Sequence, residues 1–120
     1  MGNPFVHVEL MSTDVNKAKT FYGKMFDWTL EDMPMPDMTY TMIRVGEGTG
    51  GGLMKNPIPG GPSTFVPYVL VDDLNAAKSK AMSLGATVMK DVTDVPNAGA
   101  FVIIADPTGA MLGLWSSKSN

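Results

Sequence analysis

The chain has 120 residues, 44% of them apolar and 18% charged, with a formal net charge of −3. This length fits one compact domain, and the slightly acidic balance gives no electrostatic case for binding nucleic acid or an anionic membrane. The chain has no cysteine, no apolar run as long as a membrane span and a polar start, MGNP, so we expect a cytoplasmic protein without disulfides or thiolate chemistry.

The first half predicts a strand, a helix and three further strands. Residues 5–10 alternate between an apolar face, with Val6, Val8 and Leu10, and a second face that carries His7 and Glu9. A helix is expected over residues 15–26, where Ser12, Thr13 and Asp14 are the candidate N-caps. Strands are expected at 28–31, at 39–45 and around Leu53. MPMPD (33–37) is expected to interrupt the sheet and GEGTGGG (46–52) to form a turn.

The second half predicts the same order of elements. After the linker NPIPGGP (56–62), a strand is expected at 65–71 and a helix at 74–84, which ends at Gly85. Strands follow at 87–90, at 101–105 and, beyond the tight turn DPTG (106–109), at 111–115. Each half therefore reads strand, helix, strand, strand, strand.

A short repeat ties the two halves together. Residues 14–19 read DVNKAK and residues 73–78 read DLNAAK, an offset of 59. The same offset relates the apolar stripes of the two predicted helices. We therefore predict a single domain, 1–120, of two modules, 1–58 and 62–120 with a linker at 59–61, whose helices are related by a near-twofold rotation.

The chain also resembles a known family. VHVELMSTDVNKAKTFYGKMF, VPYVLVDDLNAAKSKAMSLGA and the closing IIADPTGAMLGLW are similar to the module signatures of the glyoxalase/bleomycin-resistance/extradiol-dioxygenase superfamily, the vicinal oxygen chelate proteins. The resemblance is nearest to small lactoylglutathione-lyase-like proteins. It implies an α+β fold in which two pseudo-symmetric βαβββ modules form a curved mixed sheet around a cleft, with the helices outside.

The resemblance also implies four metal-ligand positions inside that cleft. In this chain they fall on His7, Gly52, Val66 and Gly113, of which only His7 has a donor atom in its side chain. Glu9 could add a carboxylate, but two ligands are fewer than the three or more that such sites use. We therefore expect no bound metal and no cofactor.

Strand parity extends the predicted lining of the cleft to residues two positions away from these four. The full predicted ligand-binding set is His7, Glu9, Gly52, Met54, Val66, Tyr68, Met111, Gly113 and Trp115. By the same parity, Leu53, Leu112 and Leu114 should pack under the helices. A bulky residue in place of Gly113 is expected to block ligand binding while it leaves the fold intact.

Several residues of this set keep more than one interpretation. His7 is a ligand contact, a metal ligand or a structural histidine bonded to Glu9, and the two together are candidates for a general base. Gly52 and Gly113 admit close approach of a ligand or backbone, or mark a bulge. Tyr68 offers a hydroxyl or packs in the core. Arg44, the only arginine, is expected at the surface and would clamp an anion only if it faced the cleft.

The expected function is metal-free binding of a small apolar or aromatic molecule. An alternative is a lyase, isomerase or dioxygenase-type enzyme that uses His7 and Glu9, with or without a metal. A third is a structural module whose cleft is filled by Met54, Met111 and Trp115. The expected partners are a small molecule and a second copy of the chain, with neither nucleic acid nor membrane.

Overall fold

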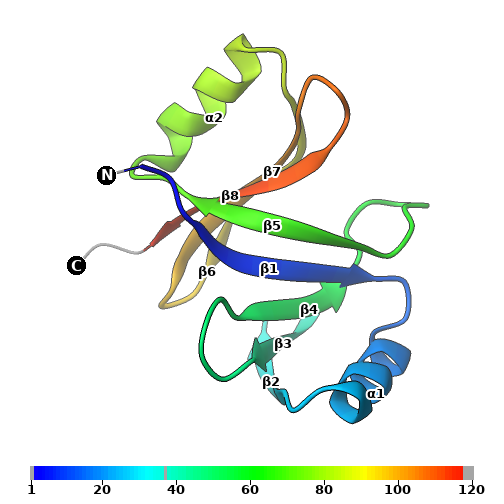
Figure 1. Cartoon of the computed structure of the whole chain (residues 1–120). Helices are drawn as coiled ribbons and strands as arrows, with labels where there is room; N and C mark the ends of the chain where they lie inside the picture. Colours follow the sequence, from blue (N-terminus) through cyan, green and yellow to red (C-terminus); the bar gives the residue numbers. More distant parts are fainter. Residues whose placement is uncertain (1, 37, 118–120) are drawn as a thin grey trace. The chain divides into compact units, whose positions relative to one another are not determined.

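The computed structural model describes residues 2–36 and 38–117, which form two compact units (Figure 1). The first-half unit is His7–Val66. The second-half unit consists of the residues up to Val6 together with those from Pro67 onward. No helix within the described residues is both long and apolar enough to cross a membrane.

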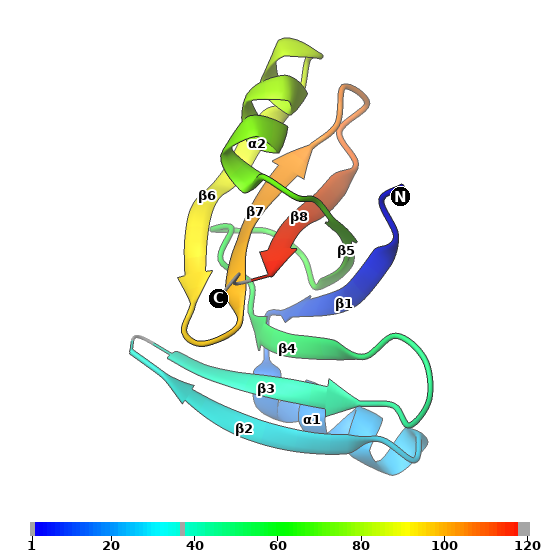
Figure 2. The ribbon, with the colours of Figure 1, turned by 90° about the vertical axis from the view of Figure 1, so that its left-hand side faces the viewer.

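The first module has one helix and a mixed group of strands. Its elements are β1 (Phe5–Ser12), α1 (Val15–Met25), β2 (Thr29–Met35), β3 (Met38–Arg44) and β4 (Gly51–Lys55). The strands lie in the order β2-β3-β4-β1, with β1 parallel to β4 and the other pairs antiparallel (Figure 2). The parallel pair requires the chain to cross from β1 to β4 by way of the helix and the hairpin.

The second module repeats this topology. Its elements are β5 (Thr64–Leu70), α2 (Leu74–Ser83), β6 (Thr87–Val95), β7 (Gly99–Ala105) and β8 (Met111–Ser117). The order is β5-β8-β7-β6, with β5 parallel to β8 and the other pairs antiparallel. The predicted α+β fold with two βαβββ modules is therefore confirmed.

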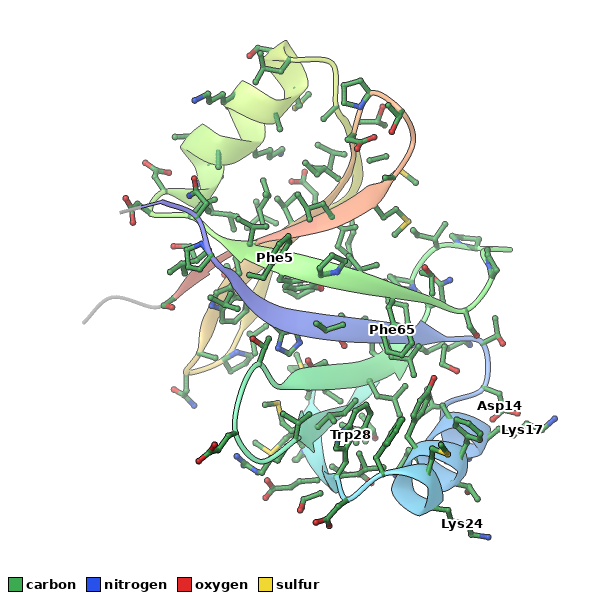
Figure 3. The ribbon with its side chains drawn as sticks, in the orientation of Figure 1. Phe5, Asp14, Lys17, Lys24, Trp28 and Phe65 are labelled. Carbon is green, nitrogen blue, oxygen red and sulfur yellow. The ribbon has the colours of Figure 1, made fainter. Side chains whose placement is uncertain are left out.

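Both helices begin at the aspartate of the sequence repeat. The carboxylate of Asp14 accepts the backbone N–H of Lys17, and that of Asp73 accepts the N–H of Ala76, each at 3.0 Å. Figure 3 shows Asp14 at the start of α1 and Lys17 directed away from the sheet. After α2, Gly85 has a φ of +101°, which explains a glycine at that helix end.

The repeat also carries an ion pair from each helix to the strand that follows it. Lys19 Nζ lies 2.9 Å from Asp32 Oδ2, and Lys78 Nζ lies 2.6 Å from Asp91 Oδ1. Lys78 comes 59 positions after Lys19, and Asp91 comes 59 positions after Asp32, so the second pair repeats the first. The Lys19 and Lys78 ammonium groups hold the pKa of Asp32 and Asp91, respectively, below the usual value.

Each helix covers an apolar cluster on one side of its strands. Under α1 the buried residues are Leu10, Ile43 and Leu53, with Trp28 against them (Figure 3). Under α2 they are Leu74, Val102, Ile104 and Leu114, with Leu112 against them. The predicted placement of Leu53, Leu112 and Leu114 beneath the helices is confirmed.

One local prediction is wrong. MPMPD does not interrupt the sheet at residues 33–35, because β2 continues to Met35 and Pro34 pairs with Thr39. β2 lies at the end of the strand order, where a residue without an N–H is tolerated. Position 37, the last of the motif, lies outside the described residues. β6 also extends further than predicted, from Thr87 to Val95 with register shifts.

Candidate functional site

A polar cluster of three side chains lies on the strands of the first-half unit, on the face opposite α1. His7 Nε2 lies 2.7 Å from Glu9 Oε1, and the Tyr40 hydroxyl lies 2.7 Å from the same oxygen and 3.0 Å from His7 Nε2. His7 and Glu9 alternate with Leu10, which packs under α1. Because successive residues of a strand point to opposite faces, His7 and Glu9 point away from α1.

The hydrogen-bond pattern restricts where protons lie. If Glu9 is ionised, Oε1 can only accept, so Tyr40 donates its hydroxyl proton to it and His7 carries a proton on Nε2. The 3.0 Å contact between His7 and Tyr40 then shares that same Nε2 proton. The three groups thus form one connected network around a single carboxylate oxygen.

The second carboxylate oxygen of Glu9 is the anomaly of this network. Glu9 is only 2% exposed, yet its Oε2 has no hydrogen-bond partner among the residues that the structure describes. Buried polar atoms in folded proteins nearly always have a partner, and a missing one costs about 1–3 kcal/mol, more for a charged group. Within the described residues, Oε2 is therefore the buried polar atom of this cluster whose hydrogen-bonding capacity the protein leaves unused.

Gly52 owes its identity to this cluster. A β-carbon on Gly52 would lie 1.7 Å from the Tyr40 hydroxyl oxygen and 3.0 Å from Glu9 Oε1. The ladder between β1 and β4 is regular here, with Glu9 opposite Gly52, so a bulge, one of the two explanations that the sequence left open, is wrong at this position. The close approach comes from a neighbouring tyrosine, a cause that the sequence interpretation did not consider.

Methionines surround the polar cluster on the same face. Met11 and Met54 lie opposite each other in the β1–β4 ladder, two residues beyond Glu9 and Gly52, and they are 0% and 5% exposed. Met42 lies opposite Gly52 on β3. Thioether side chains adapt their shape to an apolar molecule, so the surroundings of Glu9 are apolar and adjustable.

The second-half unit has aromatic side chains at the equivalent positions. Tyr68 lies opposite Gly113 as Glu9 lies opposite Gly52. A β-carbon on Gly113 would lie 2.2 Å from Tyr68 Cδ1, so the tyrosine ring fills its place. The Tyr68 ring is 2% exposed and lies 5.6 Å from the Phe101 ring. This packing favours the core interpretation of Tyr68, and it means that bulk at position 113 would disturb the fold.

The remaining predicted residues fall in both units. Trp115 lies opposite Phe101 and Leu70, on the face away from Leu114 and α2. Met111 lies further along β8, opposite Ala105, and Val66, in the first-half unit, is fully buried. The first-half unit thus brings together His7, Glu9, Gly52 and Met54. That all nine line one cavity stays a prediction.

Arg44 lies on the same face as Met42 and Tyr40, because it alternates with Ile43 of the α1 cluster. Its guanidinium donates from Nη2 to Glu31 Oε1 at 2.7 Å and from Nε at 3.3 Å. The side chain is 61% exposed, as expected for a surface position. Its charge is already paired with a carboxylate.

The donors present do not fit the metal centre that the family resemblance implies. Of the four positions, Gly52 and Gly113 have no room for a side chain, because tyrosines occupy that space, and Val66 has no donor. Within residues 2–36 and 38–117, no group of three or more His, Cys, Asp or Glu side chains could hold a metal. The polar groups that this site offers to a bound molecule are therefore His7, Glu9 and Tyr40.

Sequence reasoning found His7 and Glu9 but missed Tyr40. The residue comes from β3, more than thirty positions away, and its face depends on the pairing of β3 with β4. The available signal was Gly52 itself, since a glycine within a strand indicates that another group approaches closely.

Comparison with known proteins identifies a family and several relatives. The family model for the Glyoxalase/Bleomycin resistance protein/Dioxygenase superfamily matches residues 5–114. CFP32 of Mycobacterium tuberculosis, whose name assigns it provisionally to the glyoxylases, is 35% identical over 117 residues, which cover 92% of this chain and 44% of CFP32. The anthracycline biosynthesis protein DnrV of Streptomyces peucetius is 25% identical over 122 residues, 89% of this chain and 44% of DnrV. The chain therefore spans less than half the length of these relatives.

Solved structures share the fold at low sequence identity. A hypothetical protein of Bacillus halodurans matches with a TM-score of 0.74 and 12% identity, covering 100% of this chain and 98% of its own. Methylmalonyl-CoA epimerase of Mycobacterium tuberculosis matches with a TM-score of 0.69 and 16% identity, covering 96% and 88%. At these identities the likeness concerns the fold alone.

Proposed function

We propose that this chain, which belongs to the glyoxalase/bleomycin resistance protein/dioxygenase superfamily, binds a small, mostly apolar molecule without a metal. The bound molecule would lie on the face of β1, β3 and β4 opposite α1, with its polar group at the His7–Glu9–Tyr40 cluster. A relative named for anthracycline biosynthesis is consistent with an aromatic compound as the ligand.

The observation that carries the proposal is the buried carboxylate of Glu9, whose second oxygen has no partner among the described residues. An apolar surface with one or two fixed polar groups is typical of small-molecule sites, because the apolar part supplies affinity and the polar part fixes orientation. Met11, Met42 and Met54 supply the apolar part.

Native mass spectrometry and elemental analysis of the purified chain test this proposal together. We expect a small molecule that is released on denaturation, or binding of added aromatic compounds, and substoichiometric metal. About one zinc, nickel, iron or manganese per chain that survives dialysis would overturn the metal-free part. Glu9→Leu keeps the site apolar and removes the polar contact, so it should weaken binding of the ligand by about tenfold or more. Glu47→Leu, on the exposed loop before β4, is the matched control and should leave the affinity unchanged.

A second candidate function is acid–base catalysis of the lyase or isomerase type. The observation in its favour is that Glu9 Oε1 accepts hydrogen bonds from two groups that can carry protons, His7 and Tyr40. Such a carboxylate could remove a proton from a bound substrate through its other oxygen. Exchange of a substrate C–H for deuterium in heavy water, lost in Glu9→Gln, would favour this function over binding alone.

A further inference from the structure

We propose that the ligand presents a hydrogen-bond donor, either a hydroxyl or a protonated amine, to Oε2 of Glu9. This inference rests on the proposed binding function and specifies the chemistry of the molecule that is bound. It separates neutral or cationic donors from carboxylates and other anions.

The two oxygens of the carboxylate are used very differently. Oε1 accepts from Tyr40 and from His7 at 2.7 Å each, whereas Oε2 has no partner among the described residues. An ionised carboxylate only accepts hydrogen bonds, so a group that stabilises Oε2 has to donate. Because Glu9 is 2% exposed, bulk water satisfies this need poorly.

The charges on this face disfavour an anion. On the strands of the first-half unit, within the described residues, the basic side chains on this face are His7 and Arg44. His7 is bonded to Glu9, and Arg44 is bonded to Glu31 at 2.7 Å. Lys55 alternates with Met54 and so belongs to the α1 side. A carboxylate ligand would therefore be repelled by the negative charge of Glu9. The two basic groups on this face would not offset this repulsion, because each is already paired with a carboxylate.

The site thus favours a ligand that donates a hydrogen bond and disfavours one with a negative charge. The methionines around it can pack against the flat apolar part of such a ligand. Both a phenolic hydroxyl and an alkylammonium meet these conditions. They differ in charge, because the ammonium would also compensate the buried carboxylate, and the experiment separates them on that basis.

The test compares four probes of one ring system: naphthalene, naphthol, naphthylmethylamine and naphthoate. Their affinities for the whole purified chain are measured by isothermal titration calorimetry at neutral pH. We expect naphthol or naphthylmethylamine to bind about tenfold or more tightly than naphthalene, the effect of one charge-assisted hydrogen bond, and naphthoate to bind most weakly. The tighter of the two donors decides between hydroxyl and amine.

The outcomes separate this inference from the function on which it rests. If naphthalene binds as tightly as the donors, or naphthoate binds as tightly as naphthol, the donor inference is wrong and binding itself stands. If none of the four probes binds, the proposed function fails. The ranking on the unmodified chain decides the question even where a variant does not fold.

A matched pair of variants adds a second readout. Glu9→Gln keeps the shape of the side chain and, with Tyr40 bonded to its oxygen, places an amide N–H donor at the former position of Oε2. The preference should then shift by about tenfold or more from naphthol towards naphthoate. Glu47→Gln removes the same charge from the exposed loop before β4 and should leave the ranking unchanged; an equal shift in both variants would overturn the assignment to Glu9.

Discussion

The hydroxyl oxygen of Tyr40 lies 1.7 Å from the point at which a β-carbon on Gly52 would stand. A side chain at position 52 and the bond from Tyr40 to Glu9 therefore exclude each other. The glycine is required by a side chain of β3, and it holds the tyrosine in reach of the buried carboxylate.

Gly52→Ala should destabilise the fold by about 1–3 kcal/mol, since the new methyl group displaces Tyr40 from Glu9 in a packed region. Urea unfolding measures this change. Gly23→Ala is the matched control: its β-carbon would have Leu30 Cδ1 at 3.7 Å, and the site is inside α1, so it should stabilise by about 0.5–1 kcal/mol. Equal effects of the two substitutions would contradict this assignment.

Gly113→Ala should also destabilise, because a β-carbon there meets the inner atoms of the Tyr68 ring at 2.2 to 2.6 Å. The cost of about 1–3 kcal/mol or more arises from overpacking. It should shrink when Tyr68 is replaced by Ala in the same chain, since the clashing ring is then absent. A double-mutant cycle in urea measures the coupling; strictly additive effects would show that Tyr68 does not require the glycine.

The ion pair between Lys19 and Asp32 should stabilise the fold at neutral pH and lose this effect in acid, when Asp32 becomes protonated. Because the Asp32 pKa is lower in the folded chain than in the unfolded chain, its contribution is present above the unfolded value of about 4 and is lost as the pH falls through the folded value. Lys19→Met should therefore lower the melting temperature at neutral pH, and the difference should vanish in strong acid. Lys17→Met, whose residue is directed away from the sheet, is the control; a difference for Lys19→Met that is constant with pH would contradict the prediction.

We expect the chain to form a homodimer. Three exposed rings surround Tyr22 on the first-half unit, those of Phe21, Phe26 and Phe65, with centroids 4.9, 6.3 and 6.1 Å from it. Such exposed apolar patches commonly mark contacts with another protein. Light scattering should give twice the mass of the chain, and Phe21→Ser should weaken the association. A monomer at all practical concentrations would count against this prediction.

The sequence by itself determined the elements that depend on neighbouring residues. The repeat that begins at Asp14 and Asp73 located both helices and their first residues, because an N-cap is made within one turn. The alternation in β1 separated His7 and Glu9 from Leu10, because a strand pleat has a fixed period of two. The resemblance then supplied the order of the modules.

Only the tertiary structure decided which groups meet. The sequence could not show that Tyr40 reaches Glu9, since this depends on the register of β3 against β4, and a shift of one residue would turn Tyr40 to the α1 side. For the same reason the cause of Gly52 was misread, and the extent of β2 through Pro34 was missed until its place at the end of the strand order was known. Register is set by contacts between residues far apart in the chain, and the local pattern of any one strand does not contain it.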